Sequence, residues 1–136
     1  MNPKEAMVRI TEGLALLLRQ NDEGATHIVK TCYELELWAF GGKPIRSFST
    51  YKKSVVTESL AVVGDFDGNQ SLILGSLLAQ MKELSNACRG NSDEPNLGMR
   101  GIVFDSVDTI ASYALALDIV IYGAEGWKDL AHAGKL

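Results

Sequence analysis

Residues 101–123, GIVFDSVDTIASYALALDIVIYG, constrain the fold more than any other part of the chain. Their apolar side chains fall on every face of a helix, and such a helix lies either in the centre of a bundle or inside a membrane. Three carboxylates, Asp105, Asp108 and Asp118, interrupt the run. No charge-free stretch therefore approaches the roughly 18 residues that a membrane span needs. The pattern predicts a nearly buried central helix over residues 102–122 of a soluble protein.

Three further segments carry the three- and four-residue apolar spacing of amphipathic helices. The first runs over residues 3–20, where Pro3 suits the first helical position because its missing N–H would be unsatisfied there. The second runs over residues 48–63. The third begins at Asn69 or Ser71, ends near Arg89, and carries a stripe that we interpret as core packing rather than a dimer seam. The stripe consists of Leu74, Leu77, Leu78, Met81, Leu84 and Cys88.

Residues 25–40 are ambiguous. Ile28, Cys32 and Leu35 have helical spacing, whereas residues 33–38 alternate strictly and would also suit a short strand. The length of the segment favours a helix, because strands usually have about 3–10 residues. Gly41 and the residues after it end the segment.

These segments together predict an all-α fold. We expect one helical domain over residues 1–136, a compact bundle of about five or six helices, of a size that buries about two thirds of its unfolded surface. Residues 64–69, GDFDGN, predict a helix-to-helix turn. Calcium is disfavoured there, because an aligned calcium loop would need ligands where Val63 and Leu74 stand. Residues 123–136 could add a short closing helix through Trp127 and Leu130.

Motifs for catalysis or metal binding are lacking. His27 and His132 are the only histidines, and no phosphate-binding loop, dinucleotide fingerprint or nucleophile elbow is present. Cys32 and Cys88 are expected to be reduced thiols of a cytoplasmic protein, because the chain starts without a secretory signal. We therefore expect no cofactor and no metal, and a role other than catalysis is favoured.

Charge is distributed unevenly along the chain. Residues 1–60 carry eight basic and seven acidic side chains, whereas residues 61–136 carry five and ten. An acidic half disfavours nucleic acid, which needs a basic surface, and suits a basic protein partner. The opposite interpretation would use the basic segment 43–53, with Lys43, Arg46, Lys52 and Lys53. More often such a segment is a loop and first helical turn with solvated cations.

Asp118 stands out because its neighbours in ALALDIVIY are apolar. An enclosed carboxylate needs a cation or hydrogen-bond donors, or else takes up a proton. It could pair internally, lie at the edge of the bundle, or act on a partner or substrate. The second function hypothesis is therefore a small helical hydrolase or ligand-binding protein, with Asp118 joined by Glu34, Glu36 or His132 in a pocket.

The first function hypothesis is a non-enzymatic cytoplasmic protein that binds a basic protein through an acidic surface. Its most concrete form is an immunity or antitoxin-like protein that neutralises a toxin or nuclease domain, with neither nucleic acid nor membrane as partner. The expected contacts are acidic residues of the second half: Asp93, Glu94, Asp105, Asp108, Asp118, Glu125 and Asp129. The sequence leaves the oligomeric state open.

Overall fold

The computed structural model describes residues 2–19, 23–87 and 97–123, and these residues form five helices without a strand. The all-α bundle predicted from the sequence is therefore confirmed. The helices are α1 (Pro3–Leu18), α2 (Glu23–Ala39), α3 (Phe48–Asp65), α4 (Gln70–Ala87) and α5 (Leu97–Tyr122).

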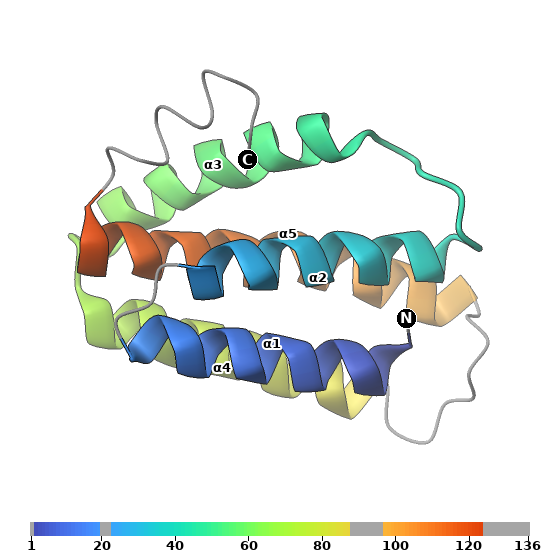
Figure 1. Ribbon diagram of the computed structural model, residues 1–136, viewed down its shortest axis with the longest axis horizontal. Coiled ribbons are helices and arrows are strands. Elements are labelled where there is room, and N and C mark those ends of the chain that lie inside the picture. Colours follow the sequence, from blue (N-terminus) through green and yellow to red (C-terminus); the bar gives the residue numbers. More distant parts are fainter. Residues whose placement is uncertain (1, 20–22, 88–96, 124–136) are drawn as a thin grey trace.

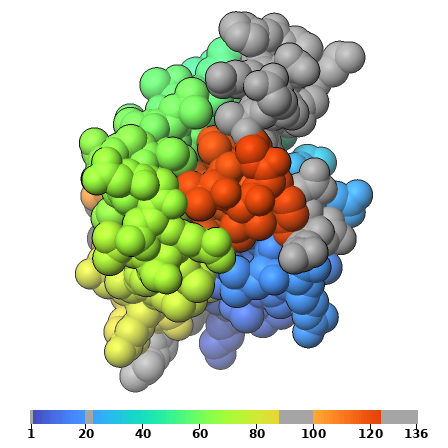
Figure 2. All heavy atoms as spheres, turned by 90° about the vertical axis from the view of Figure 1, so that its left-hand side faces the viewer, coloured from blue at the N-terminus to red at the C-terminus, as the bar shows by residue number. Residues whose placement is uncertain are grey.

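Consecutive helices run in opposite directions, and all five lie roughly along one axis (Figure 1). In that view α2 and α5 form a middle layer, with α3 on one side and the pair α1 and α4 on the other. Helix α5 contacts α2, α3 and α4, while α1 packs chiefly on α2. Seen from the end of the bundle, α5 (red) lies beside α3 and α4 on one side and above the N-terminal helices (Figure 2).

Helix α5 is the centre of the bundle, as its sequence predicts. Residues 114–118 are five consecutive buried residues. Because 3.6 residues complete a turn, five in succession cover every face of the helix. The helix begins at Leu97, five residues ahead of the expected start at residue 102. No helix in the described part of the chain is long and apolar enough to cross a membrane.

Helices α1 and α2 approach each other closely through two glycines. A Cβ atom on Gly24 would lie 2.3 Å from the carbonyl oxygen of Gly13 and 2.6 Å from the backbone nitrogen of Leu17. No side chain fits at that distance, so glycine is required for the contact. Asn2 caps the N-terminus of α1, since the backbone N–H of Glu5 donates to its Oδ1 at 2.9 Å.

The ambiguous segment 33–38 is helical and lies inside α2. Burial follows the helical face of Cys32, Leu35 and Ala39 and not the alternation, because Glu36 is buried although Glu34 is exposed. The helix ends where Gly41 and Gly42 adopt positive φ angles of 72° and 83°. The backbone N–H of Gly42 donates to the carbonyl oxygen of Leu37 at 2.7 Å and so satisfies one of the last carbonyls.

The buried stripe of α4 is rotated from the predicted one. Ile73, Leu77, Met81 and Leu84 are buried, whereas Leu78 is 47% exposed. The prediction was therefore wrong for Leu78 and missed Ile73, because α4 packs mainly on α5 and buries only a narrow face.

The turn predicted between α3 and α4 is present at residues 66–69. Asp67 and Gly68 both have positive φ angles there, 52° and 65°. Aspartate and glycine are among the residues that tolerate this conformation. Cys88 and the expected closing helix after Gly123 lie outside the described residues.

Candidate functional site

The acidic residues predicted as partner contacts are not gathered on one face of the described chain. Asp93, Glu94, Glu125 and Asp129 lie outside the described residues. The other three are on α5 in different environments: Asp105 is exposed, Asp108 is partly buried in an ion pair, and Asp118 is 1% exposed.

Asp118 is enclosed in the bundle rather than presented at its surface. It follows Asp108 by ten residues on α5, which places it about 15 Å further along the helix axis. The carboxylates expected beside it are engaged elsewhere. Glu34 accepts from Arg9 at 3.2 Å and Glu36 accepts from Arg46, while His132 lies outside the described residues. The structure therefore does not bring Glu34 or Glu36 to Asp118.

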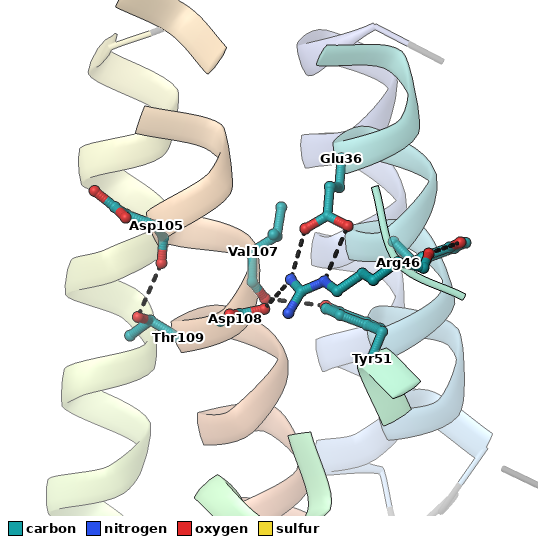
Figure 3. A network of polar contacts seen from close by, with 8 residues as sticks. Glu36, Arg46, Tyr51, Asp105, Val107, Asp108 and Thr109 are labelled. Atoms are coloured by element: carbon teal, nitrogen blue, oxygen red, sulfur yellow. Dashed lines mark hydrogen bonds and ion pairs between the residues drawn. The ribbon is translucent and has the colours of Figure 1, made fainter. Parts of the chain in front are cut away.

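An ion cluster joins α2, α5 and the segment between α2 and α3 (Figure 3). Arg46, in that segment, donates from Nη2 to Oε1 of Glu36 at 2.6 Å and from Nε to Oε2 at 3.2 Å. The same Nη2 donates to Oδ1 of Asp108 at 2.6 Å. The Glu36 side chain is only 2% exposed and that of Asp108 is 35% exposed. One guanidinium thus bridges a buried carboxylate and a partly exposed one.

Aromatic rings complete the surroundings of this guanidinium. The Cζ atom of Arg46 lies 4.8 Å from the ring centroid of Tyr51 and 5.3 Å from that of Phe104. These are distances at which a cation is attracted to an aromatic face. We call Glu36, Tyr51, Phe104 and Asp108 the arginine cage. The hydroxyl group of Tyr51 donates to the carbonyl oxygen of Val107 at 3.2 Å and so fixes its ring against α5.

The cage shifts the pKa values of its own groups and of its neighbour Cys32. Burial by itself would lower the pKa of Arg46, but hydrogen bonds to Glu36 and Asp108 outweigh it and raise the pKa above its ordinary value. Burial raises the pKa of Tyr51 and the pKa of Cys32, and the nearby carboxylates add to both shifts. Arg46 therefore stays charged, while the phenol and the thiol stay neutral at physiological pH.

The basic segment 43–53 was expected to keep its cations in solvent, and the structure corrects this for two of them. The side chain of Arg46 points into the cage, and Lys52 is 7% exposed with Nζ 4.8 Å from the Phe48 ring centroid. Burial lowers the pKa of Lys52. Lys43 and Lys53 are exposed as expected. The segment thus does not present its four cations together, as a nucleic-acid surface would require.

A hollow of about 180 Å³ lies between α3 and α5 and adjoins the cage at Asp108. It is lined by Ser54, Glu58, Val62, Asp108, Thr109, Ser112 and Tyr113. We call it the α3–α5 groove. Two carboxylates and three aliphatic hydroxyl groups line it, and none of its lining residues is basic. Its chemistry suits a cation that also donates hydrogen bonds.

The sequence contained a signal for the cage that spacing alone did not reveal. Glu36 falls on the apolar face of α2, beside Cys32 and Leu35, and a buried carboxylate requires a cation or several donors. The first basic residues that follow Glu36 along the chain are Lys43 and Arg46. Of the two, only arginine can bridge two carboxylates with a planar set of donors.

Comparison with known proteins finds no matching family model, no matching curated protein and no matching solved structure. Among the described residues, no group of three or more His, Cys, Asp or Glu is arranged to hold a metal ion. The function must therefore be inferred from the groove and the cage themselves.

Proposed function

We propose that this chain is a non-enzymatic protein-binding module that holds a basic partner through the α3–α5 groove. The observation that carries the proposal is the lining of the groove, where Glu58 and Asp108 stand among hydroxyl groups without a basic residue. A lysine or arginine of a partner would find carboxylate and hydroxyl acceptors there.

The charge around the groove strengthens this argument. Asp108 and Glu36 together carry two negative charges, and Arg46 neutralises one of them. Glu58 adds a further negative charge on the opposite wall. The chain as a whole has a net charge of −4. An acidic hollow in an acidic protein attracts a positively charged surface and speeds its association.

The same lining weighs against an enzyme that uses this groove. General acids and bases are most often His, with Glu, Asp, Lys, Tyr and Cys also used, and a nucleophilic Ser needs an adjacent base. The groove residues include no His, Cys or Lys, Asp108 is paired with Arg46, and Ser54 and Ser112 have no histidine beside them in the lining. The alternative pocket around Asp118 has less support, since Glu34 and Glu36 are engaged with Arg9 and Arg46.

The concrete form of the proposal is an immunity or antitoxin-like role in the cytoplasm. A toxin or nuclease domain that acts on nucleic acid carries a basic surface, and an acidic groove can cover such a surface. Asp93, Glu94, Glu125 and Asp129 lie outside the described residues and stay predicted contacts.

The test compares two charge reversals of equal size. Glu58→Lys changes the groove, whereas Glu83→Lys changes an exposed residue on α4 and serves as the control. Tagged wild type and both variants are used for affinity capture from the native lysate, followed by mass spectrometry and by kinetics with the purified partner. We expect a basic partner that wild type and Glu83→Lys retain and that Glu58→Lys loses.

In the kinetic measurement, Glu58→Lys should lower the association rate constant about tenfold at low salt, and the difference should shrink as the salt concentration rises. Equal capture and equal rates for the two reversals would contradict the role of the groove. A captured partner with an acidic surface would contradict the proposed class of partner.

A further inference from the structure

We propose that the arginine cage is a recognition site for arginine side chains, which Arg46 fills in the free chain and an arginine of the partner takes over. This inference rests on the proposed function for its biological meaning, and it names the chemical group that the site recognises. The structure shows the site with a guanidinium in it, namely that of Arg46 (Figure 3).

The geometry of the cage selects a guanidinium over an ammonium group. Glu36 accepts two hydrogen bonds from two nitrogens of the same guanidinium, at 2.6 and 3.2 Å. Such a paired contact needs a planar group with several donors in fixed directions. The rings of Tyr51 and Phe104 lie 4.8 and 5.3 Å from its central carbon. A lysine ammonium could satisfy the charge but not this paired contact.

The cage is placed where a partner could reach it. Asp108 belongs both to the cage and to the lining of the α3–α5 groove. Its side chain is 35% exposed, and that of Arg46 is 18% exposed. A cation that enters the groove therefore meets one carboxylate of the cage directly. With two carboxylates and one guanidinium, the cage also keeps one negative charge that attracts a second cation.

Arg46 is held in a way that lets its side chain leave without unwinding a helix. It lies in the segment between α2 and α3, ahead of the N-cap residue Ser47. The preceding residues 41–45 are exposed. The hydroxyl group of Tyr33 donates to the carbonyl oxygen of Arg46 at 2.7 Å, and this bond holds the backbone independently of the side chain. Exchange thus requires rotation of one side chain toward solvent.

Arg46 and an external arginine should compete for the arginine cage. A group tethered beside its own site competes at an effective concentration in the millimolar range. A short arginine peptide should therefore bind wild type weakly, because it must displace Arg46. Removing Arg46 should make the same peptide bind more tightly, whereas a purely structural role predicts only a loss of stability.

The experiment uses the full chain with Arg46→Ala, and the peptides acetyl-Gly-Arg-Gly-amide and acetyl-Gly-Lys-Gly-amide. Binding is measured by calorimetry, and the helical circular dichroism of each variant is checked first. We expect the arginine peptide to bind Arg46→Ala about tenfold more tightly than wild type. The affinity of the lysine peptide should rise less than about threefold. In the double variant Arg46→Ala, Glu36→Gln the affinity of the arginine peptide should not rise.

Equal affinity of the arginine peptide for Arg46→Ala and wild type would overturn the inference, and so would an equal gain for the lysine peptide. If Arg46→Ala lacks the helical signal, Arg46→Lys takes its place, and the arginine peptide must still bind it more tightly than wild type. The peptides test the cage without the natural partner. If the arginine peptide binds Arg46→Ala more tightly but Glu58→Lys leaves partner capture unchanged, the proposed function is refuted and the inference about the cage is not.

Discussion

The contact between α1 and α2 and the contact of α3 with α5 bury different kinds of side chain. The first is apolar and close: a Cβ on Gly13 would lie 2.7 Å from Ile28, and one on Gly24 would lie 2.3 Å from a backbone oxygen. The second holds the partly exposed Asp108, the buried Ser112 and a hollow of about 180 Å³.

This difference separates the part of the bundle that specifies the fold from the part available for binding. The α1–α2 contact has no space for an added atom, so its residues are determined by fit. The α3–α5 contact retains space, hydroxyl groups and charge, and these features do not maximise packing. Buried ion pairs add little net stability compared with apolar packing. Their presence beside the groove is what directs the functional proposal to α3 and α5.

The largest expected effect on stability comes from Arg46→Ala. It leaves the Glu36 carboxylate, 2% exposed, without its guanidinium. Loss of one partner from a buried pair should lower the free energy of unfolding by about 3 kcal/mol. Arg46→Lys, which keeps the charge but not the paired contact, should lose about half of that. Urea denaturation of both variants measures the difference, and a loss below about 0.5 kcal/mol for Arg46→Ala would mean that the Glu36 carboxylate is not buried as the structure has it.

The next largest effect concerns the apolar contact. Gly24→Ala places a Cβ 2.3 Å from the carbonyl oxygen of Gly13, so α1 and α2 must move apart. We expect a loss of about 2 kcal/mol. Gly75→Ala on α4 is the matched control, because a Cβ there meets nothing within 4 Å. Alanine in an open helical position should stabilise by about 0.5–1 kcal/mol. Similar midpoints of thermal unfolding for the two variants would contradict the close approach.

A more gradual effect, spread over several pH units, is expected at alkaline pH. Burial raises the pKa values of Tyr51 and Cys32 in the folded chain above those in the unfolded chain. Above about pH 8.5 for the thiol and pH 10 for the phenol, the unfolded chain therefore binds fewer protons than the folded chain. The stability contribution is complete below these values and is lost as the pH rises through the folded pKa values.

As the pH rises from the pKa of a group in the unfolded chain to its higher pKa in the folded chain, the free energy of unfolding should fall by about 1.4 kcal/mol per pH unit for that group. Urea midpoints measured from pH 8 to pH 11 test this slope. The variant Tyr51→Phe should flatten the part above about pH 10. An unchanged midpoint across the range in wild type would show that neither group is buried as the structure has it.

Most of the fold was predictable because its signals are local. The cap at Asn2, the stop at Gly41 and Gly42, and the continuous apolar run of α5 each act through neighbouring residues. The face of α4 that is buried was harder to predict. Both Leu74 with Leu78 and Ile73 with Leu77 form apolar rows, and contact with α5 decides which row is buried.

The site was harder to predict, because ion pairing depends on segments that the fold brings together. The sequence singled out Asp108, but as a residue that contacts a protein partner. Its partner Arg46 is 62 residues away in the chain, and Glu36 reaches the same guanidinium from a third element. Sequence spacing within one helix contains no information about contacts between side chains of separate elements.

Nuclear magnetic resonance can show whether cations bind at the α3–α5 groove rather than elsewhere on the surface. The ¹⁵N-labelled chain is titrated with the arginine peptide, and the lysine peptide serves as the comparison. We expect amide shifts centred on Ser54, Glu58, Thr109 and Ser112 and on Asp108, which the groove shares with the cage, and these shifts should weaken as salt is raised. Shifts centred instead on exposed acids elsewhere, such as Glu12 and Glu83, would contradict it.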